Sequence, residues 1–122
     1  MKVVVVEDEE ILGKVLKEKL EKEKFKVSLA TDGEAAVPLI SDVVPDIVIL
    51  DLILPKKDGF EVLKELKASP NLKQIPVLVL SNLGQDEEIK KALSLGAIDY
   101  LVKTQHPIKE VVEKVKNYLI HR

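Results

Sequence analysis

The sequence predicts an α/β protein with a doubly wound, five-stranded parallel sheet in the order 2-1-3-4-5 and five helices covering both faces. Two observations carry this prediction. Short β-branched, apolar runs alternate with longer amphipathic runs along the 122 residues. The strand runs are also almost continuously apolar, which is typical of parallel strands buried on both faces. Because crossovers are right-handed, few strand orders remain. We expect a single domain over residues 1–122.

The first 45 residues predict two strands and two helices. The run Lys2–Val6 is the first strand, and the run Phe25–Ala30 is the second. A weaker second helix opens at Asp32 and runs toward Ile40, with Pro38 inside it, so we expect a kink or a short helix there. Helical spacing identifies the apolar positions of the first helix, which are Ile11, Leu12, Val15, Leu16 and Leu20.

The middle of the chain continues the alternation. A third strand, Ile47–Asp51, follows Pro45 and Asp46. A third helix covers about Phe60–Ala68, with Leu63 and Leu66 facing inward. Pro76 precedes a fourth strand, Val77–Ser81.

The last third of the chain predicts two helices around one strand. The fourth helix runs from about Asp86 to Leu95 and ends at Gly96, which suits the position just past a helix. The fifth strand is Asp99–Lys103. The last helix starts near Pro107, a residue favoured at the first helical position. Its apolar stripe is Ile108, Val111, Val112, Val115 and Leu119.

Composition excludes several classes of protein. With 19 basic and 21 acidic residues, the formal charge of −2 gives no general reason to expect nucleic acid or an anionic membrane as a partner. No apolar run approaches the roughly 18 residues of a membrane span, and Val3–Val6 is too short for a signal peptide. The absence of Cys excludes disulfides, thiolate metal sites and cysteine nucleophiles. We expect a soluble, cytoplasmic protein.

Charged and hydroxyl side chains stand where the predicted strands end. Glu7 and Asp8 follow the first strand, Asp51 ends the third, Ser81 the fourth and Lys103 the fifth. In an open parallel sheet, ligands bind beyond the carboxyl ends of the strands, at the point where the strand order reverses. The sequence therefore predicts one crevice that holds three carboxylates, a hydroxyl and an ammonium.

Asp51 carries the strongest functional signal. Eight of the nine residues from Ile47 to Pro55 are apolar, and the ninth is Asp51, whose charge is costly there unless something requires it. Three carboxylates in one crevice repel, and a divalent cation resolves the conflict; oxygen ligands favour Mg²⁺ over a transition metal. Such a site brings a phosphoryl group to a carboxylate nucleophile, with Lys103 and Ser81 balancing its oxygens.

Structural roles compete with these functions when each residue is taken alone. Asp8 and the two glutamates after it are also an ordinary acidic helix start. A solvated side chain is the default for Lys103, and a satisfied hydroxyl at a strand end is the default for Ser81. His106 and His121 show no partner pattern, so we interpret both as structural or exposed. The joint placement at the strand ends favours function.

Four motifs resemble the receiver domain of two-component response regulators, the CheY-like family with its flavodoxin-like fold. They are "VVVVEDEE", "DIVILDLILPKKDG", "PVLVLSN" and "GAIDYLVK", and they are distributed over nearly the whole chain. The resemblance implies that Asp51 is the phosphoacceptor. It also implies that Asp8 binds Mg²⁺ directly, that Glu7 assists, and that the backbone carbonyl of Ile53 is a further ligand.

The resemblance also implies a switch and a set of partners. Ser81 would follow the phosphoryl group, Lys103 would be its ion partner, and Tyr100 would be the aromatic switch, although a half-buried aromatic on an edge strand is the default for Tyr100. The donor would be a phosphohistidine on a sensor histidine kinase or a phosphotransfer protein. The domain would catalyse its own phosphorylation and dephosphorylation without being an enzyme for another substrate. Output would use the face of the fourth helix, fifth strand and fifth helix, in a monomer or a phosphorylation-dependent dimer.

The sequence departs from the family pattern at four positions. Thr104 follows Lys103 where many receivers have a cis proline; a cis bond without proline costs about 3 kcal/mol, so the isomer stays open. Asn82 is larger than the small residue often found after the Ser or Thr, and it would narrow access to Asp51. Ile53 and Leu83 offer no polar side chain to position water, so we expect a long-lived phosphoryl state.

Three alternatives belong to other functional classes. A haloacid-dehalogenase-like phosphatase needs a second acid two residues after its nucleophile, where this chain has Ile53. A nucleotide- or flavin-binding module needs a Gly-rich or hydroxyl-rich loop after the first strand, where this chain has "EDEE". A receiver-like interaction domain that never becomes phosphorylated stays open at this point.

Overall fold

The computed structural model describes residues 1–120, and within them five strands alternate with five helices. The strands are β1 (Lys2–Val6), β2 (Lys26–Ala30), β3 (Ile47–Leu50), β4 (Val77–Ser81) and β5 (Asp99–Val102). The helices are α1 (Glu10–Lys22), α2 (Gly33–Val43), α3 (Gly59–Ala68), α4 (Asp86–Ser94) and α5 (Ile108–Ile120). The strands pair in parallel in the order β2-β1-β3-β4-β5. The predicted fold is confirmed.

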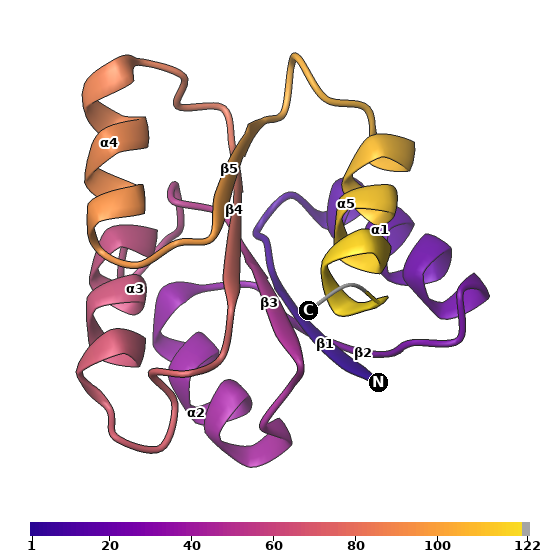
Figure 1. Cartoon of the computed structure of the whole chain (residues 1–122), viewed down its shortest axis with the longest axis horizontal. Helices are drawn as coiled ribbons and strands as arrows, with labels where there is room; N and C mark the ends of the chain where they lie inside the picture. The colour runs from indigo at the N-terminus through magenta and orange to yellow at the C-terminus, as the bar shows by residue number, and fades with distance from the viewer. Residues whose placement is uncertain (121–122) are drawn as a thin grey trace.

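The sheet lies between two layers of helices, with α2, α3 and α4 on one face and α1 and α5 on the other (Figure 1). Successive side chains of a strand point to opposite faces. Val4 and Val6 therefore pack in the core under α2 to α4, whereas Val3 and Val5 pack in the core under α1 and α5. This two-sided burial explains why β1 is a continuous apolar run.

Two predicted strands extended one residue too far. The strand geometry stops at Leu50 and Val102, so Asp51 and Lys103 are the first residues past their strands. Their N–H groups still donate to neighbouring strands, from Asp51 to the Val6 carbonyl at 3.0 Å and from Lys103 to the Ser81 carbonyl at 2.9 Å. Hydrogen bonds therefore fix the backbone of both residues at the carboxyl ends of the strands.

The predicted start of the second strand was also wrong by one residue. The Phe25 N–H donates to the Leu20 carbonyl at 3.2 Å, so Phe25 closes the turn that follows α1, and β2 begins at Lys26. In α1 itself, Leu16 and Leu20 are buried as predicted, but Ile11 is 80% exposed. Ile11 lies in the first turn, off the stripe that faces the sheet.

At two prolines the structure differs from part of the prediction. Helix α2 continues through Pro38 to Val43, so it is not short; the proline ring removes one helical hydrogen bond and the rest of the helix persists. Helix α5 begins at Ile108, and the Pro107 carbonyl accepts from the N–H groups of Glu110 and Val111. Pro107 is therefore the residue before the helix and not its first residue.

The end of α4 confirms the predicted role of Gly96. Gly96 has a φ of +108°, its N–H donates to the Leu93 carbonyl at 3.0 Å, and the Ala97 N–H donates to the Ala92 carbonyl at 3.1 Å. These bonds form a Schellman motif, which requires the left-handed backbone that glycine adopts without strain.

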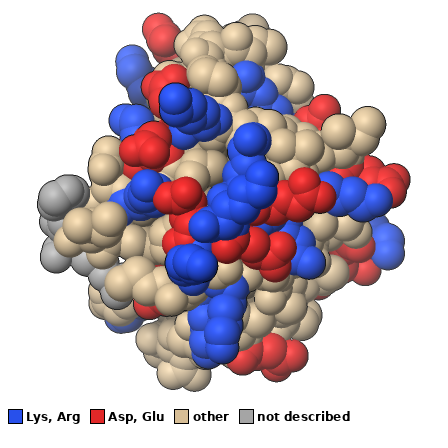
Figure 2. Space-filling model, turned by 90° about the vertical axis from the view of Figure 1, so that its right-hand side faces the viewer, with Lys and Arg blue, Asp and Glu red and all other residues tan. Residues whose placement is uncertain are grey.

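The surface over α1 and α5 carries charges of both signs. Figure 2 shows basic and acidic side chains interspersed on this side of the molecule. Ion pairs account for part of this pattern, since Lys14 lies 3.2 Å from Glu10 and Lys116 lies 2.6 Å from Glu23. None of the helices within residues 1–120 has the length and apolar character that crossing a bilayer requires.

Candidate functional site

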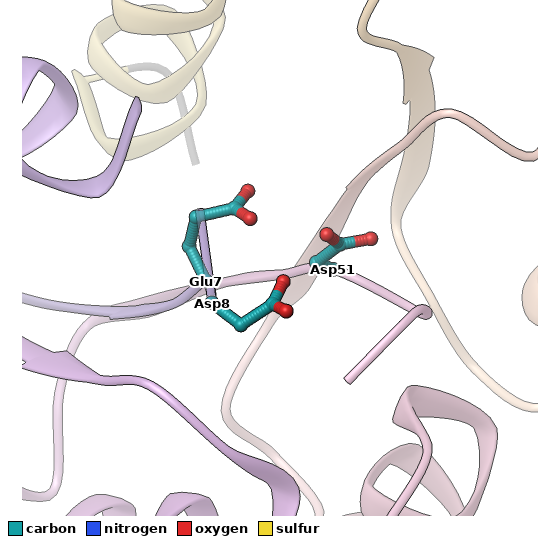
Figure 3. Close-up of side chains that lie close together, drawn as sticks. All are labelled: Glu7, Asp8 and Asp51. Carbon is teal, nitrogen blue, oxygen red and sulfur yellow. The ribbon is translucent and has the colours of Figure 1, made fainter. Parts of the chain in front are cut away.

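Three carboxylates meet at the carboxyl edge of the sheet, between β1 and β3, where the strand order reverses. Figure 3 shows Glu7, Asp8 and Asp51 close together, with the carboxylates of Glu7 and Asp8 turned toward the side of Asp51. One oxygen from each lies within 4.8 Å of the others. Glu7 is 2% exposed and Asp51 is 3% exposed, whereas Asp8 is exposed. The strand ends therefore bring together the acids that the sequence placed there.

Lys103 inserts its ammonium among these acids. Its Nζ lies 2.8 Å from Asp51 Oδ2 and 2.9 Å from Glu7 Oε1, and it also contacts the Glu9 carboxylate. Burial lowers the pKa of Lys103, but hydrogen bonds to Asp51, Glu9 and Glu7 outweigh burial and raise the pKa overall. Lys103 is therefore a permanent cation, and the default interpretation of a solvated lysine is wrong.

One ammonium does not balance the acids around it. Burial raises the pKa of Glu7 from 4.5 to about 7; the Lys103 hydrogen bond opposes this shift and the nearby charge of Asp51 adds to it. The excess negative charge and the hard oxygen donors fit a divalent cation such as Mg²⁺ or Mn²⁺. Glu7, Asp8 and Asp51 are the side chains that would hold it.

The loop after Asp51 holds that carboxylate in place. The Ile53 N–H donates to Asp51 Oδ1 at 3.1 Å, and Lys103 donates to Oδ2, so each carboxylate oxygen of Asp51 has a donor. Gly59, the first residue of α3, packs directly on the same backbone: a Cβ there would lie 2.3 Å from the Asp51 carbonyl oxygen. The side chain of Ile53 is 51% exposed beside the site.

Ser81 and Tyr100 are linked through the backbone of Leu83. Ser81 is fully buried, and its Oγ accepts from the Leu83 N–H at 3.4 Å. The Tyr100 hydroxyl donates to the Leu83 carbonyl at 2.5 Å. Burial, with the negative charge of Glu88, raises the pKa of Tyr100 to about 12, so it stays protonated. At 8% exposure Tyr100 is buried and not half-buried as we expected.

The remaining expectations have mixed outcomes. His106 is half-buried with its Nδ1 2.9 Å from Glu110 Oε1, which agrees with a structural role, and His121 lies outside the described residues. No peptide bond in residues 1–120 is cis, so the bond between Lys103 and Thr104 is trans. The contact of Glu9 with Lys103 was not predicted, because an acidic helix start gives no signal that a lysine 94 residues later will reach it.

The buried Asp51 lies beside two further acids and pairs with a lysine, at the point where the strand order of a 2-1-3-4-5 sheet reverses. This combination defines a class of α/β domains whose acidic site includes a lysine. Within that class, the chain belongs to the response regulator receiver domain family, whose model matches residues 3–116.

Solved structures agree with this membership. The BeF3-activated N-terminal receiver domain of Klebsiella pneumoniae RstA is 31% identical, with a TM-score of 0.86, over 95% of this chain and 96% of that one. The phosphorylated cyanobacterial phytochrome response regulator RcpA is 32% identical, with a TM-score of 0.84, over 96% and 91%. The Mn²⁺-bound response regulator Rcp1 is 29% identical, with a TM-score of 0.85, over 97% and 93%.

Proposed function

We propose that residues 1–122 form one phosphorylation-activated receiver in which Asp51 accepts a phosphoryl group from a sensor histidine kinase or a histidine phosphotransfer protein. The observation that carries the proposal is the position of the Asp51 carboxylate, which is almost fully buried and yet lies within 4.8 Å of two further acids. A buried carboxylate among like charges is costly unless a charged partner joins it. The phosphorylated state of the related regulator RcpA supports the same interpretation.

The proposed reaction is an in-line transfer. An Asp51 oxygen attacks phosphorus and forms the new P–O bond, while the P–N bond of the donor phosphohistidine breaks and its electron pair returns to the imidazole nitrogen. Lys103, already 2.8 Å from Asp51, would balance charge on the phosphoryl oxygens. The Ser81 hydroxyl would donate to one of these oxygens after releasing the Leu83 N–H. The domain would catalyse both this transfer and the later loss of phosphate.

We further propose that the site requires Mg²⁺, held by Glu7, Asp8, Asp51 and the backbone carbonyl of Ile53. When bound, the ion supplies positive charge for the phosphoryl oxygens. The acidic cluster supports this assignment, as does the Mn²⁺ bound in the related Rcp1.

Output would pass through Tyr100. The Leu83 N–H donates to Ser81, and the Leu83 carbonyl accepts from the Tyr100 hydroxyl. A shift of Ser81 toward a phosphoryl group would therefore move Leu83 and alter the hydrogen bond that holds Tyr100. Tyr100 packs with α4, and the face of α4, β5 and α5 would then change shape and contact a downstream protein or a second copy of the chain. The side chains of Ile53 and Leu83 are apolar and cannot position an attacking water, which supports a long lifetime of the phosphoryl group. We also propose a cytoplasmic location.

The test is intact mass after incubation with Mg²⁺ and acetyl phosphate. We expect one phosphate adduct, lost in Asp51→Asn and in a metal-free sample. Asp42→Asn, an exposed aspartate on α2, is the matched control and should keep the adduct. No adduct on the wild-type chain in the presence of Mg²⁺ would favour a receiver-like interaction domain that is never phosphorylated.

A further inference from the structure

Glu9 occupies the start of α1 and yet its side chain does not serve that helix. Its backbone is extended, with φ −74° and ψ 107°, and it is the residue that precedes the helix. Its side chain accepts no capping hydrogen bond from the backbone of the helix start. It contacts the ammonium of Lys103, while its own N–H donates to Glu7 Oε2 at 3.1 Å. The side chain is therefore directed at the site and not at the helix.

The carboxylates that contact Lys103 within residues 1–120 differ sharply in burial. The side chains of Glu7 and Asp51 are 2% and 3% exposed, whereas that of Glu9 is 53% exposed. Releasing a buried carboxylate from its cation leaves an unpaired buried charge, which is costly. Releasing an exposed carboxylate returns it to water at little cost. Glu9 is thus the partner that Lys103 loses most easily.

The ammonium has no donor to spare. A lysine ammonium has three N–H bonds, and in the described part of the chain three carboxylates contact that of Lys103. A phosphoryl group on Asp51 brings three acceptor oxygens and a charge of about −1.5 to −2. Its first oxygen at Lys103 takes the place of the Asp51 carboxylate, which phosphorylation converts into an acyl phosphate. A second phosphoryl oxygen can bind the ammonium only by displacing Glu7 or Glu9.

We propose that Glu9 is a positioning residue that holds Lys103 in the unphosphorylated state and competes with the phosphoryl group for it. This inference rests on the proposed function of Asp51. Phosphorylation displaces the Glu9 carboxylate into solvent. Because the ion pair of Glu9 with Lys103 must break first, it lowers the affinity of the site for the phosphoryl group. Glu9 sets how tightly the phosphorylated state is held, without touching the phosphorus.

The experiment compares Glu9→Gln with Glu10→Gln. Both variants remove one negative charge from the same helix start, but Glu10 pairs with the exposed Lys14 at 3.2 Å and not with Lys103. The measurement is the affinity for beryllofluoride at saturating Mg²⁺, followed by the rate of phosphate loss after acetyl phosphate treatment. We expect Glu9→Gln to bind beryllofluoride about two- to fivefold more tightly than wild type and to lose phosphate correspondingly more slowly, the range of an exposed ion pair. Glu10→Gln should match wild type.

The direction of the effect separates competition from a structural role. A merely structural Glu9 would leave affinity unchanged or weaken it on substitution, and either result would overturn the inference. Equal gains in Glu9→Gln and Glu10→Gln would also overturn it, because they would reflect general charge. If wild type takes up neither beryllofluoride nor phosphate, the proposed function fails and this inference fails with it. If wild type takes up both and the variants behave alike, only this inference fails.

Discussion

Lys103 Nζ lies 2.8 Å from Asp51 Oδ2 and joins the residue after β5 to the residue after β3, across the intervening strand β4. The side chains of both residues are at most 10% exposed. Glu7, at 2% exposure, shares the same ammonium. Buried charges are stable only when they are paired. Removing one of them leaves the others without a partner and lowers the free energy of unfolding.

Lys103→Met should therefore destabilise the protein strongly. The substitution leaves Glu7 and Asp51 buried without their cation, and we expect the free energy of unfolding to fall by about 3 kcal/mol in the absence of divalent metal. Urea denaturation in EDTA measures this loss. Adding Mg²⁺ should restore more stability to the variant than to wild type, because the metal would replace the missing positive charge.

Lys14→Met is the matched control for Lys103. Lys14 pairs with Glu10 at 3.2 Å, but the two side chains are 67% and 81% exposed. Exposed pairs contribute less than about 1 kcal/mol, so this variant should stay close to wild type. Equal losses in the two lysine variants would contradict the cooperative burial of the site.

The stability of the metal-free protein should fall with rising pH because of Glu7. Its pKa is about 7 in the folded protein and 4.5 ordinarily, chiefly through burial. Between these values the folded protein retains a proton that the unfolded chain has lost. The resulting stabilisation is complete below pH 4.5 and disappears as the pH rises through about 7. A tenfold difference in proton affinity between the folded and unfolded chains corresponds to about 1.4 kcal/mol of stability.

Glu7→Gln isolates this contribution, since glutamine resembles the protonated acid and does not titrate. Urea unfolding of both proteins in EDTA, from about pH 5 to about pH 8, should show wild type losing stability relative to the variant. A difference between the two proteins that stays constant over this range would mean that Glu7 is ionised throughout.

Gly59→Ala should disturb the loop that carries Asp51. A Cβ at this position would lie 2.3 Å from the Asp51 carbonyl oxygen and 2.5 Å from Leu52 Cα, both backbone atoms that cannot move aside alone. We expect a loss of about 2–3 kcal/mol in the free energy of unfolding, together with slower phosphorylation. Gly84→Ala is the control, since its Cβ meets side-chain atoms of Val102 at 3.5 Å, an ordinary contact. Similar stabilities for the two variants would contradict the close packing at Gly59.

Tyr100→Phe removes the hydroxyl that donates to the Leu83 carbonyl at 2.5 Å while leaving the buried ring in place. The loss should be about 1 kcal/mol in urea denaturation, the usual value of such a bond. Tyr118→Phe, in a tyrosine that is 39% exposed, should change stability little. If Tyr100→Phe is as stable as wild type, the hydroxyl does not hold the β4–α4 loop.

Much of the fold was predictable because its signals are local. The apolar run Lys2–Val6 predicted a two-sided strand, and Gly96 predicted the end of α4, where only a left-handed backbone completes the helix. The errors arose where packing against residues distant in the sequence outweighed a local signal. Pro38 predicted a kink or a short helix, but α2 is not short: it continues to Val43, and Ala36 and Ile40 are buried against the sheet.

The site divides in the same way. Residues 7, 8, 51, 81 and 103 were predicted as its members from strand ends alone, because parallel strands deliver their carboxyl ends to one edge. The structure places Glu7, Asp8, Asp51 and Lys103 together there. It also gives Ser81 a different neighbour, the Leu83 N–H, which no strand-end rule foresees.

The sequence by itself determined the strands and helices, the edge where the site lies and the acids that form it. The elements follow from periodicity, and the sheet order and the edge follow from the right-handed crossovers of such a chain. Only the tertiary structure decided that Glu9 shares Lys103 with Asp51, that burial raises the pKa of Glu7, and that Gly59 touches the Asp51 carbonyl. These relationships depend on distances between residues up to 96 positions apart, and on how much water reaches them. Periodicity along the chain contains neither quantity.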